Sequence, residues 1–594
     1  MDNRPNAPQP APQPAPQPAP QPAPQPVPQP APQPVPQPAP QPAPQPMPGQ
    51  PYGRPPYMAQ PPYPPRPVGW TPPAPKPVYP MGKADGAMAM LLLALTLIGV
   101  VAGLWGGFHA GFAAAFDATF VALSIYLKRK GHFADPFAAV CGLLSLALPG
   151  VFVVTSNPTV RFFSVIALGC TSMVWYAGLA GYRIPAGEGG LVRHLASMIG
   201  GAAGHMPRGM RSLTAANKSR GMAFGKVMLG LACAVPVVLV VVPLLIRSDE
   251  AFEGFSQNLF GDIGTVVGQL IVTALLAPFV ISFALWLKKE EQKPAVPSTF
   301  KGVDTLILSV FLGVVAVIYA LYLVSQLAYF FSAFAGFLPE GYHFTYAEYA
   351  RRGFFEMSAI AGINLALLLL VLFLSRKRED RLPAPLKALG TFLGLFTLVL
   401  IGTALSKMVM YILNFGLTVD RVGTSAAMIV AAVVFAALIL RLYFRRVRVL
   451  HTALIAAALV LLTLGVGNVN DVIARYNVEA YADGRLEELD VNYLAELGDE
   501  GVPYLVALTE DENKDIAREA ANGLRWTYWN YYDKQGAKRC PKISQFGVSR
   551  QRAYDAFEKY LADHKAFEPV VPRESEWPGE WRDDTPVPTP PWLM

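Results

Sequence analysis

The chain has 594 residues and a formal net charge of +7; 52% of its residues are hydrophobic and only 15% are charged. This composition excludes an ordinary soluble domain, and apolar blocks of about 20 residues or more are long enough to cross a bilayer as helices. The basic residues do not indicate nucleic-acid binding, because most of them lie at the ends of these blocks.

Charge and cysteine content divide the chain further. Residues 1–469 hold 34 Lys and Arg against 18 Asp and Glu, whereas residues 470–594 hold 15 against 24, so a basic membrane part is followed by an acidic tail. The cysteines form no C-x-x-C pair and have no metal-ligand spacing; they are Cys141, Cys170, Cys233 and Cys540. We therefore expect no disulfide framework, no structural metal and no cofactor.

Residues 1–84 form a proline-rich arm. A repeat of Pro-Gln-Pro with Ala or Val runs through residues 7–46, and proline stays frequent as far as Pro80. Such a segment cannot bury a core and favours a hydrated polyproline II spacer, so we expect a disordered arm. Binding to a proline-recognising partner is the alternative. No apolar stretch precedes residue 86, so the first membrane helix is expected to act as its own insertion signal.

The blocks between residues 85 and 469 predict an all-α fold, a polytopic transmembrane helix bundle of about eleven helices. The first two helices are separated only by Gly106 and Gly107. The predicted helices cover residues 86–105, 109–127, 134–154, 159–179, 224–246, 264–287, 303–332, 354–375, 385–415, 423–443 and 449–468.

The loops between these helices alternate in charge. Every second loop is basic, and the loops between are poor in basic residues or acidic. This alternation follows the positive-inside rule and predicts a cytoplasmic N-terminus and an extracytoplasmic C-terminus. The basic loops are 128–130, 183–226, 288–301, 376–387 and 445–448. The exception is Arg351-Arg352, which Glu348 and Glu356 offset.

Residues 470–566 predict a small helical soluble domain, and residues 567–594 a tail rich in Pro and Trp. Short amphipathic runs at 490–497, 502–509 and 513–524 are broken by Gly and Pro, and one of them resembles a single repeat of the HEAT type. The aromatic cluster at 526–532 is consistent with a core, a membrane contact or a glycan contact. We expect the domain to offer a surface for an envelope protein partner.

Polar residues on three predicted helices fall on single faces and at matching depth. A lysine stem can reach several Å toward the surface, and an intramembrane charge usually has a partner. We therefore predict that Glu356 and Lys407 pair in an outward-facing polar seam that binds a ligand. In the alternative interpretation, Lys407 only extends its ammonium group toward the membrane surface, and Glu356 is favoured by the helix dipole at the start of its helix. The tyrosines then form a belt at the membrane interface. The other seam residues are Tyr319, Tyr322, Gln326, Tyr329, Asn364, Tyr411 and Asn414.

Asp117 is a further charge deep in a predicted helix. It could be protonated, hydrogen-bonded to a hydroxyl or paired elsewhere, and a proton relay is one hypothesis. No phosphate-binding loop, nucleophile elbow, HExxH sequence or other metal-binding cluster occurs, so no catalytic residue is predicted.

Three stretches carry a family resemblance. They are Y-A-E-Y-A-R-R-G-F-F-E at 346–356, A-L-S-K-M-V-M-Y-I-L-N-F-G-L-T at 404–418 and A-R-Y-N-V at 474–478. Over roughly residues 85–530 the chain resembles the uncharacterised bacterial membrane families named domains of unknown function 4153 and 4173. The first stretch forms a charged, aromatic collar at a membrane boundary, with Tyr346, Glu348, Tyr349, Arg351 and Arg352 as its signature. Phe415 before the glycine departs mildly from the family pattern.

The resemblance implies a protein of the bacterial cytoplasmic membrane and assigns it no activity. Three functions remain open at this point. The first is a scaffold or sensor that links the cytosol to the cell envelope, and the second is a transporter-like or ligand-binding protein that uses the seam. A membrane-embedded envelope enzyme is the third.

Overall fold

The structure, a computed structural model, describes part of the second of two compact units, Met1–Pro77 and Val78–Met594. The described residues are 82–128, 135–182, 190–207, 250–289, 303–335, 354–375, 382–532, 545–565, 567 and 569. Side chains are described in all of these except 250–264, 289, 325–335 and 354–355. The proline-rich arm and the final tail lie outside this set, apart from residues 82–84, 567 and 569.

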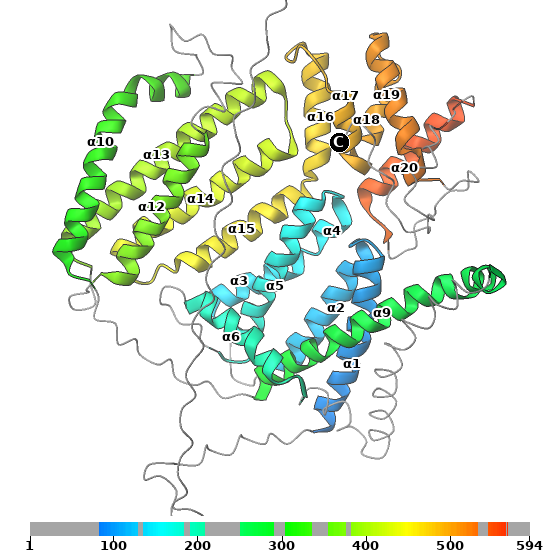
Figure 1. The fold of residues 1–594 in the computed structure, drawn as a ribbon, viewed down its shortest axis with the longest axis horizontal. Helices are drawn as coiled ribbons and strands as arrows, with labels where there is room; N and C mark the ends of the chain where they lie inside the picture. Colours follow the sequence, from blue (N-terminus) through cyan, green and yellow to red (C-terminus); the bar gives the residue numbers. More distant parts are fainter. Residues whose placement is uncertain are drawn as a thin grey trace, which may run out of the picture. The chain divides into compact units, whose positions relative to one another are not determined.

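The described backbone is helical apart from its loops and an isolated bridge between Val303 and Ser375 (Figure 1). The bundle consists of α1 (Lys83–Val100), the π-helical turn η1 (Val101–Trp105), α2 (Ala110–Leu127), α3 (Pro136–Ala147), α4 (Gly150–Val154), α5 (Pro158–Leu179), α6 (Gly190–Gly204), α9 (Glu250–Lys289), α10 (Thr305–Ala335), α12 (Phe354–Leu374), α13 (Ala384–Phe415), α14 (Val419–Tyr443) and α15 (Val449–Val466). The C-terminal helices are α16 (Val469–Ala482), α17 (Val491–Glu496), η2 (Gly498–Glu500), α18 (Val502–Leu508), α19 (Lys514–Thr527), η3 (Tyr528–Asn530) and α20 (Val548–Asp563).

Ten helical segments of the described chain are long and apolar enough to cross a membrane. They confirm ten of the eleven predicted crossings at similar bounds; the predicted helix at 224–246 lies outside the described residues. The segments are Lys83–Trp105, Ala110–Leu127, Pro136–Val154, Pro158–Leu179, Thr265–Lys288, Thr305–Val324, Glu356–Leu374, Ala384–Phe415, Val419–Tyr443 and Val449–Val466. Many of their large apolar side chains are exposed, as a bilayer requires.

Local sequence explains where several helices begin. Asp135, Asn157 and Thr418 are N-cap residues whose side chains accept hydrogen bonds from backbone N–H groups of α3, α5 and α14. The predicted break between the first two helices is confirmed at the glycine pair. There Gly107 has a φ of +79°, a backbone conformation that glycine adopts without a steric penalty.

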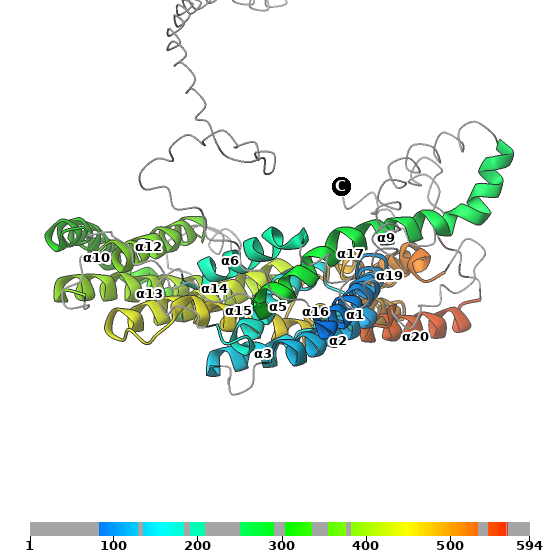
Figure 2. The same ribbon diagram turned by 90° about the horizontal axis from the view of Figure 1, so that it is seen from below.

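One end of the bundle gathers basic residues, and we call it the basic end. Tyr126, in the last turn of α2, donates a 2.7 Å hydrogen bond to Asp85 in the first turn of α1. The Lys288 ammonium group of α9 lies 3.5 Å from the centre of the Tyr126 ring. Tyr182, just after α5, stacks on Trp286 of α9. Helix α9 packs against α1 and crosses it obliquely in Figure 1, and the two lie side by side in Figure 2.

The remaining bundle helices follow the same up-and-down order. The bridge between Val303 and Ser375 places the start of α10 beside the end of α12, and Lys387 at the start of α13 lies over the Tyr443 ring at the end of α14. Arg448, just before α15, forms a 3.1 Å ion pair with Asp135. The starts of α1, α3, α10, α13 and α15 therefore all belong to the basic end.

The C-terminal helices pack on the opposite end, which we call the domain end. Phe152 of α4 and Leu494 of α17 are fully buried members of one apolar core that also includes Phe557 of α20. The aromatic cluster at 526–532 contributes Trp529, Tyr531 and Tyr532 as buried side chains, so the core interpretation is confirmed for these three. Figure 1 shows α16 to α20 together beyond the end of α15.

Candidate functional site

A chain of hydrogen bonds joins three membrane helices in the predicted seam. The Tyr319 hydroxyl of α10 donates to Asn364 Oδ1 of α12 at 2.9 Å. Asn364 Nδ2 donates to Thr397 Oγ1 of α13 at 2.9 Å, and Thr397 donates to the Leu393 carbonyl at 2.8 Å. Asn364 and Thr397 are both fully buried, so each polar group that these bonds use is satisfied inside the bundle.

Aromatic rings pack around this chain. The Tyr319 ring stacks on Phe396 of α13, with centroids 4.3 Å apart, and Tyr322 meets the same ring edge-on at 6.2 Å. Beside them, α12, α13 and α14 line a partly open cavity of about 310 Å³. The cavity walls are apolar except for Ser358 and Thr424; the other lining residues are Met357, Ala361, Gly362, Leu365, Leu400, Ile401, Ala404, Ala427, Met428, Ala431 and Phe435.

The two predicted charges lie on the helices expected for them. Glu356 is exposed in the first turn of α12, and Lys407 is half-buried on α13. The ion pairs between described residues do not include one between these two, and their pairing stays a prediction. Tyr411 packs edge-on against Phe415.

Other predicted residues fall at the edge of the seam or outside the described set. Asn414 Nδ2 donates to the Met410 carbonyl at 2.8 Å, within its own helix. The side chains of Gln326 and Tyr329 lie outside the described residues. So does the collar signature of Tyr346, Glu348, Tyr349, Arg351 and Arg352.

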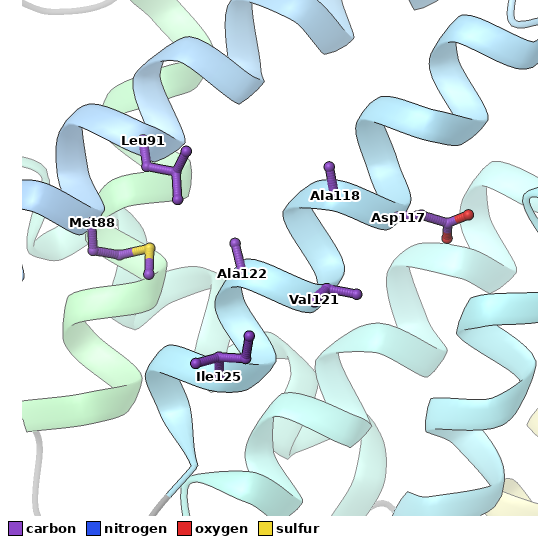
Figure 3. Close-up of a pocket in the computed structure, with 7 residues that line it drawn as sticks. All are labelled: Met88, Leu91, Asp117, Ala118, Val121, Ala122 and Ile125. Atoms are coloured by element: carbon purple, nitrogen blue, oxygen red, sulfur yellow. The ribbon is translucent and has the colours of Figure 1, made fainter.

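Asp117 lies beside an open groove of about 600 Å³ formed by α1 and α2. Apart from Asp117, the groove is lined by apolar residues: Met88, Leu91, Ala118, Val121, Ala122 and Ile125. Figure 3 shows the carboxyl of Asp117 pointing away from Met88 and Leu91. Its Oδ1 atom is buried and has no hydrogen-bond partner among the described residues.

A second polar cluster, which sequence reasoning missed, joins the C-terminal helices to the bundle. Glu500 ends η2 and is 2% exposed. Its Oε1 accepts from the backbone N–H of Ser156 at 2.7 Å and from Thr155 Oγ1 at 3.3 Å. Its Oε2 accepts from Ser156 Oγ. The carboxylate therefore provides the acceptor for hydrogen-bond donors of the loop between α4 and α5, at the domain end.

Arg161 of α5 extends this cluster. Its guanidinium donates to the carbonyls of Thr155 at 2.7 Å, Gly107 at 3.2 Å and Phe152 at 3.4 Å, and it contacts His109 Nδ1 at 3.1 Å. Burial, and after it the charges of Arg161 and Arg550, lower the pKa of His109 to about 3. His109 is therefore neutral at ordinary pH, and Nδ1 is free to accept from Arg161.

Asparagine side chains make most of the remaining contacts. Asn157 donates to Asn470 Oδ1 at 2.7 Å, and Asn470 donates to the Leu497 carbonyl at 3.0 Å. Asn468 donates to Ser549 at 2.9 Å, and Ser549 donates to the Val154 carbonyl at 2.7 Å. We call these asparagine contacts, together with Glu500, Thr155, Ser156, Arg161 and His109, the domain junction.

The domain junction continues where two of the family-like stretches meet. Asn477 lies in A-R-Y-N-V, and its side chain accepts from the Leu417 N–H at 2.7 Å and donates to the Leu417 carbonyl at 2.9 Å. A Cβ at the neighbouring Gly416, whose φ is +75°, would lie 2.6 Å from Asn477 Oδ1. The turn between α13 and α14 is thus shaped to receive Asn477, and Asn477 and this turn complete the domain junction.

No group of three or more His, Cys, Asp or Glu that could hold a metal occurs within the part of the chain that the structure describes. The domain junction is occupied by its own hydrogen bonds. Its signal in the sequence is weak, because Ser156 and Glu500 are 344 positions apart.

Comparison with known proteins gives one match, to a protein family. The chain has no significant match among curated proteins or among solved structures. Residues 138–508 match the model of the family described as "Domain of unknown function (DUF4153)". This stretch contains every described helix from α4 to α18, together with Asn477, Ser156 and Glu500. The ten apolar helices are typical of a multi-pass membrane protein, and the chain belongs to the DUF4153 family.

Proposed function

We propose that this protein is a sensor or scaffold of the bacterial cytoplasmic membrane. Its C-terminal domain binds a partner in the cell envelope, and the domain junction transmits that event to the membrane helices. The observation that carries the proposal is the buried carboxylate of Glu500, which accepts hydrogen bonds from the α4–α5 loop. If the domain were joined to the bundle only through the last membrane helix, the Glu500 carboxylate and the donors of the α4–α5 loop would be exposed to water.

The physical reason is the cost of separating the two parts. Undocking the domain would remove Glu500 from three donors and Asn477 from both polar atoms of Leu417. Hydrogen bonds to charged groups contribute about 1.5–3 kcal/mol each to stability. The domain and the ends of α4, α5, α13 and α14 therefore move together, and a force on the domain reaches those helices.

The two bundle ends support a cytoplasmic N-terminus and an extracytoplasmic domain. The basic end carries Lys83, Lys128, Lys288, Lys387 and Arg448, as cytoplasmic loops do under the positive-inside rule. The domain end carries the acidic C-terminal helices. The start of α1 and the C-terminal domain belong to opposite ends, which is the arrangement that an odd number of crossings produces.

The proline-rich arm completes the proposal on the cytoplasmic side. Its repeats and the tyrosines of its second half suit recognition by a proline-binding domain. In this scheme an envelope partner outside and a proline-binding partner inside are joined by one membrane protein.

A cavity favours a second candidate, a ligand-binding or transporter-like protein. The cavity between α12, α13 and α14 has a volume of about 310 Å³ and is lined by Met357, next to Glu356. Its largely apolar walls suit a hydrophobic ligand. Neighbouring Asn364 is already satisfied by Tyr319 and Thr397, so the seam offers that ligand few polar groups, and we rank this function second.

Photo-crosslinking in living cells tests the proposal. A photoreactive residue replaces Glu519, which is exposed on α19, or Leu505, which is fully buried in α18. We expect a discrete protein adduct from position 519 and none from position 505. The absence of protein adducts from exposed positions on α17, α19 and α20, together with solute uptake by the purified protein in vesicles, would instead establish the second candidate.

A further inference from the structure

Asp117 lies at mid-depth in the membrane. His109 precedes α2 at the domain end, and Tyr126 ends α2 at the basic end. At 1.5 Å per residue, Asp117 is about 12 Å from the first and about 13 Å from the second along the helix axis. The hydrocarbon core of a bilayer is about 30 Å thick, so Asp117 lies near its centre.

The surroundings of Asp117 contain little that could stabilise a negative charge. The groove beside it is lined by aliphatic side chains and Met88, and Ile125 at one end of the groove is 72% exposed. The Oδ1 atom of Asp117 is buried without a hydrogen-bond partner among the described residues. Figure 3 shows Asp117 and Val121 on the same side of α2.

The elements packed against α2 are α1, η1, α4, α5 and α9. Their described charged groups lie at the ends of the bundle: Lys83, Asp85 and Lys288 at the basic end, and Arg161 at the domain end beside His109. Cys170 and Tyr176 of α5 are uncharged at neutral pH. At the depth of Asp117 the described parts of these elements carry no cation.

We propose that Asp117 is a proton-binding carboxyl within the membrane, neutral at pH 7 and located beside the groove of α1 and α2. An unpaired carboxylate at this depth is strongly disfavoured, whereas a protonated carboxyl is not. The ligand of the site is a proton. This site is independent of the domain junction.

Dicyclohexylcarbodiimide tests the proposal on the full-length protein in its native membranes. The reagent is hydrophobic and requires a protonated carboxyl: the proton goes to one carbodiimide nitrogen, the carboxyl oxygen adds to the central carbon, and the acyl group then shifts to nitrogen to give a stable N-acylurea. Nothing is released. We expect mass spectrometry to find the adduct on Asp117 at pH 7, and a water-soluble carbodiimide to leave Asp117 unmodified.

Two variants make the result decisive. Asp117→Asn should remove the adduct and leave the midpoint of thermal unfolding in detergent unchanged, because Asn resembles a neutral carboxyl. Ala118→Asp on the Asp117→Asn background restores a carboxyl to the groove at the same depth, and its labelling shows that the reagent arrives. Labelling of the Ala118→Asp protein without labelling of wild-type Asp117 would overturn the proposal. A lower unfolding midpoint for Asp117→Asn would also overturn it, because the carboxylate would then have been ionised and paired.

Discussion

Glu500 accepts a 2.7 Å hydrogen bond from the backbone N–H of Ser156, a residue 344 positions earlier in the chain. This contact joins a turn of the C-terminal helices to the loop between two membrane helices. Because the Glu500 carboxylate is buried, no water could take its place as the acceptor for these donors. The docked arrangement of the C-terminal helices therefore depends on this carboxylate.

Replacing Glu500 is expected to loosen the domain. Glu500→Ala leaves the Ser156 N–H and the Thr155 hydroxyl without their acceptor, at a cost of about 2–4 kcal/mol. We expect a lower midpoint of thermal unfolding in detergent and faster protease cleavage within α16 to α18. Glu519→Ala, on the exposed face of α19, is the control and should behave as wild type. Equal behaviour of the two variants would show that the Glu500 contacts do not hold the domain.

Glycine substitutions test the packing of α15 on α4. A Cβ at Gly465 would lie 2.4 Å from Val151 Cγ1, whereas a Cβ at Gly423 in α14 meets nothing within 4 Å. Gly465→Ala should therefore destabilise the protein by about 1–3 kcal/mol. Gly423→Ala should be neutral or stabilise it by up to about 1 kcal/mol. Unfolding midpoints in one detergent give both values, and a reversed order would contradict the observed packing.

The bond between Tyr319 and Asn364 should appear as a coupling energy. Tyr319→Phe removes the donor, Asn364→Leu removes the acceptor, and the double variant completes a cycle. Hydrogen bonds between membrane helices contribute about 0.6 kcal/mol on average and at most about 1.7 kcal/mol, and we expect a coupling within that range. Strictly additive losses would mean that the two side chains do not interact in the membrane.

His109 should make the protein sensitive to acid. Its pKa is about 3 in the folded protein and 6.5 ordinarily, because burial and then Arg161 and Arg550 disfavour its protonation. Between pH 6.5 and 3 the unfolded chain binds a proton that the folded protein does not. The His109 contribution is therefore fully present above pH 6.5 and falls with pH by up to about 1.4 kcal/mol per unit.

His109→Gln removes this proton uptake and should flatten the loss of stability between pH 6.5 and pH 4. The control is His564→Gln, at an exposed position after α20. Unfolding midpoints measured across that pH range decide the matter. If both variants keep the wild-type slope, His109 is not the group that titrates.

The sequence predicted the membrane helices well because a bilayer imposes a length and an apolar composition that a single segment displays by itself. It also grouped Tyr319 and Asn364 in one polar seam, since each belongs to a set of polar residues on a single helix face, and the two side chains are hydrogen-bonded. Thr397 was missed, because a threonine on an apolar helix usually bonds its own backbone, as Thr397 also does with Leu393.

The domain junction could not be predicted in the same way. Glu500 lies in a short acidic turn that reads as a solvated surface, and Ser156 reads as part of an ordinary helix start. Their contact depends on how α15 and α16 direct the chain back over the α4–α5 loop, which no local pattern encodes. Asn477 and Gly416 both lie in stretches that carry the family resemblance, but the contact between them follows from the packing alone.

We propose that the C-terminal helices, docked on the end of the bundle opposite the start of α1, lie outside the cytoplasm. The most direct test is labelling with a membrane-impermeant thiol reagent in a background without native cysteines. The exposed positions are Asp515→Cys in α19 and Lys83→Cys at the start of α1. We predict labelling at position 515 in intact cells and at position 83 only after the cells are broken. Labelling at position 83 in intact cells, with position 515 protected, would overturn the proposed topology.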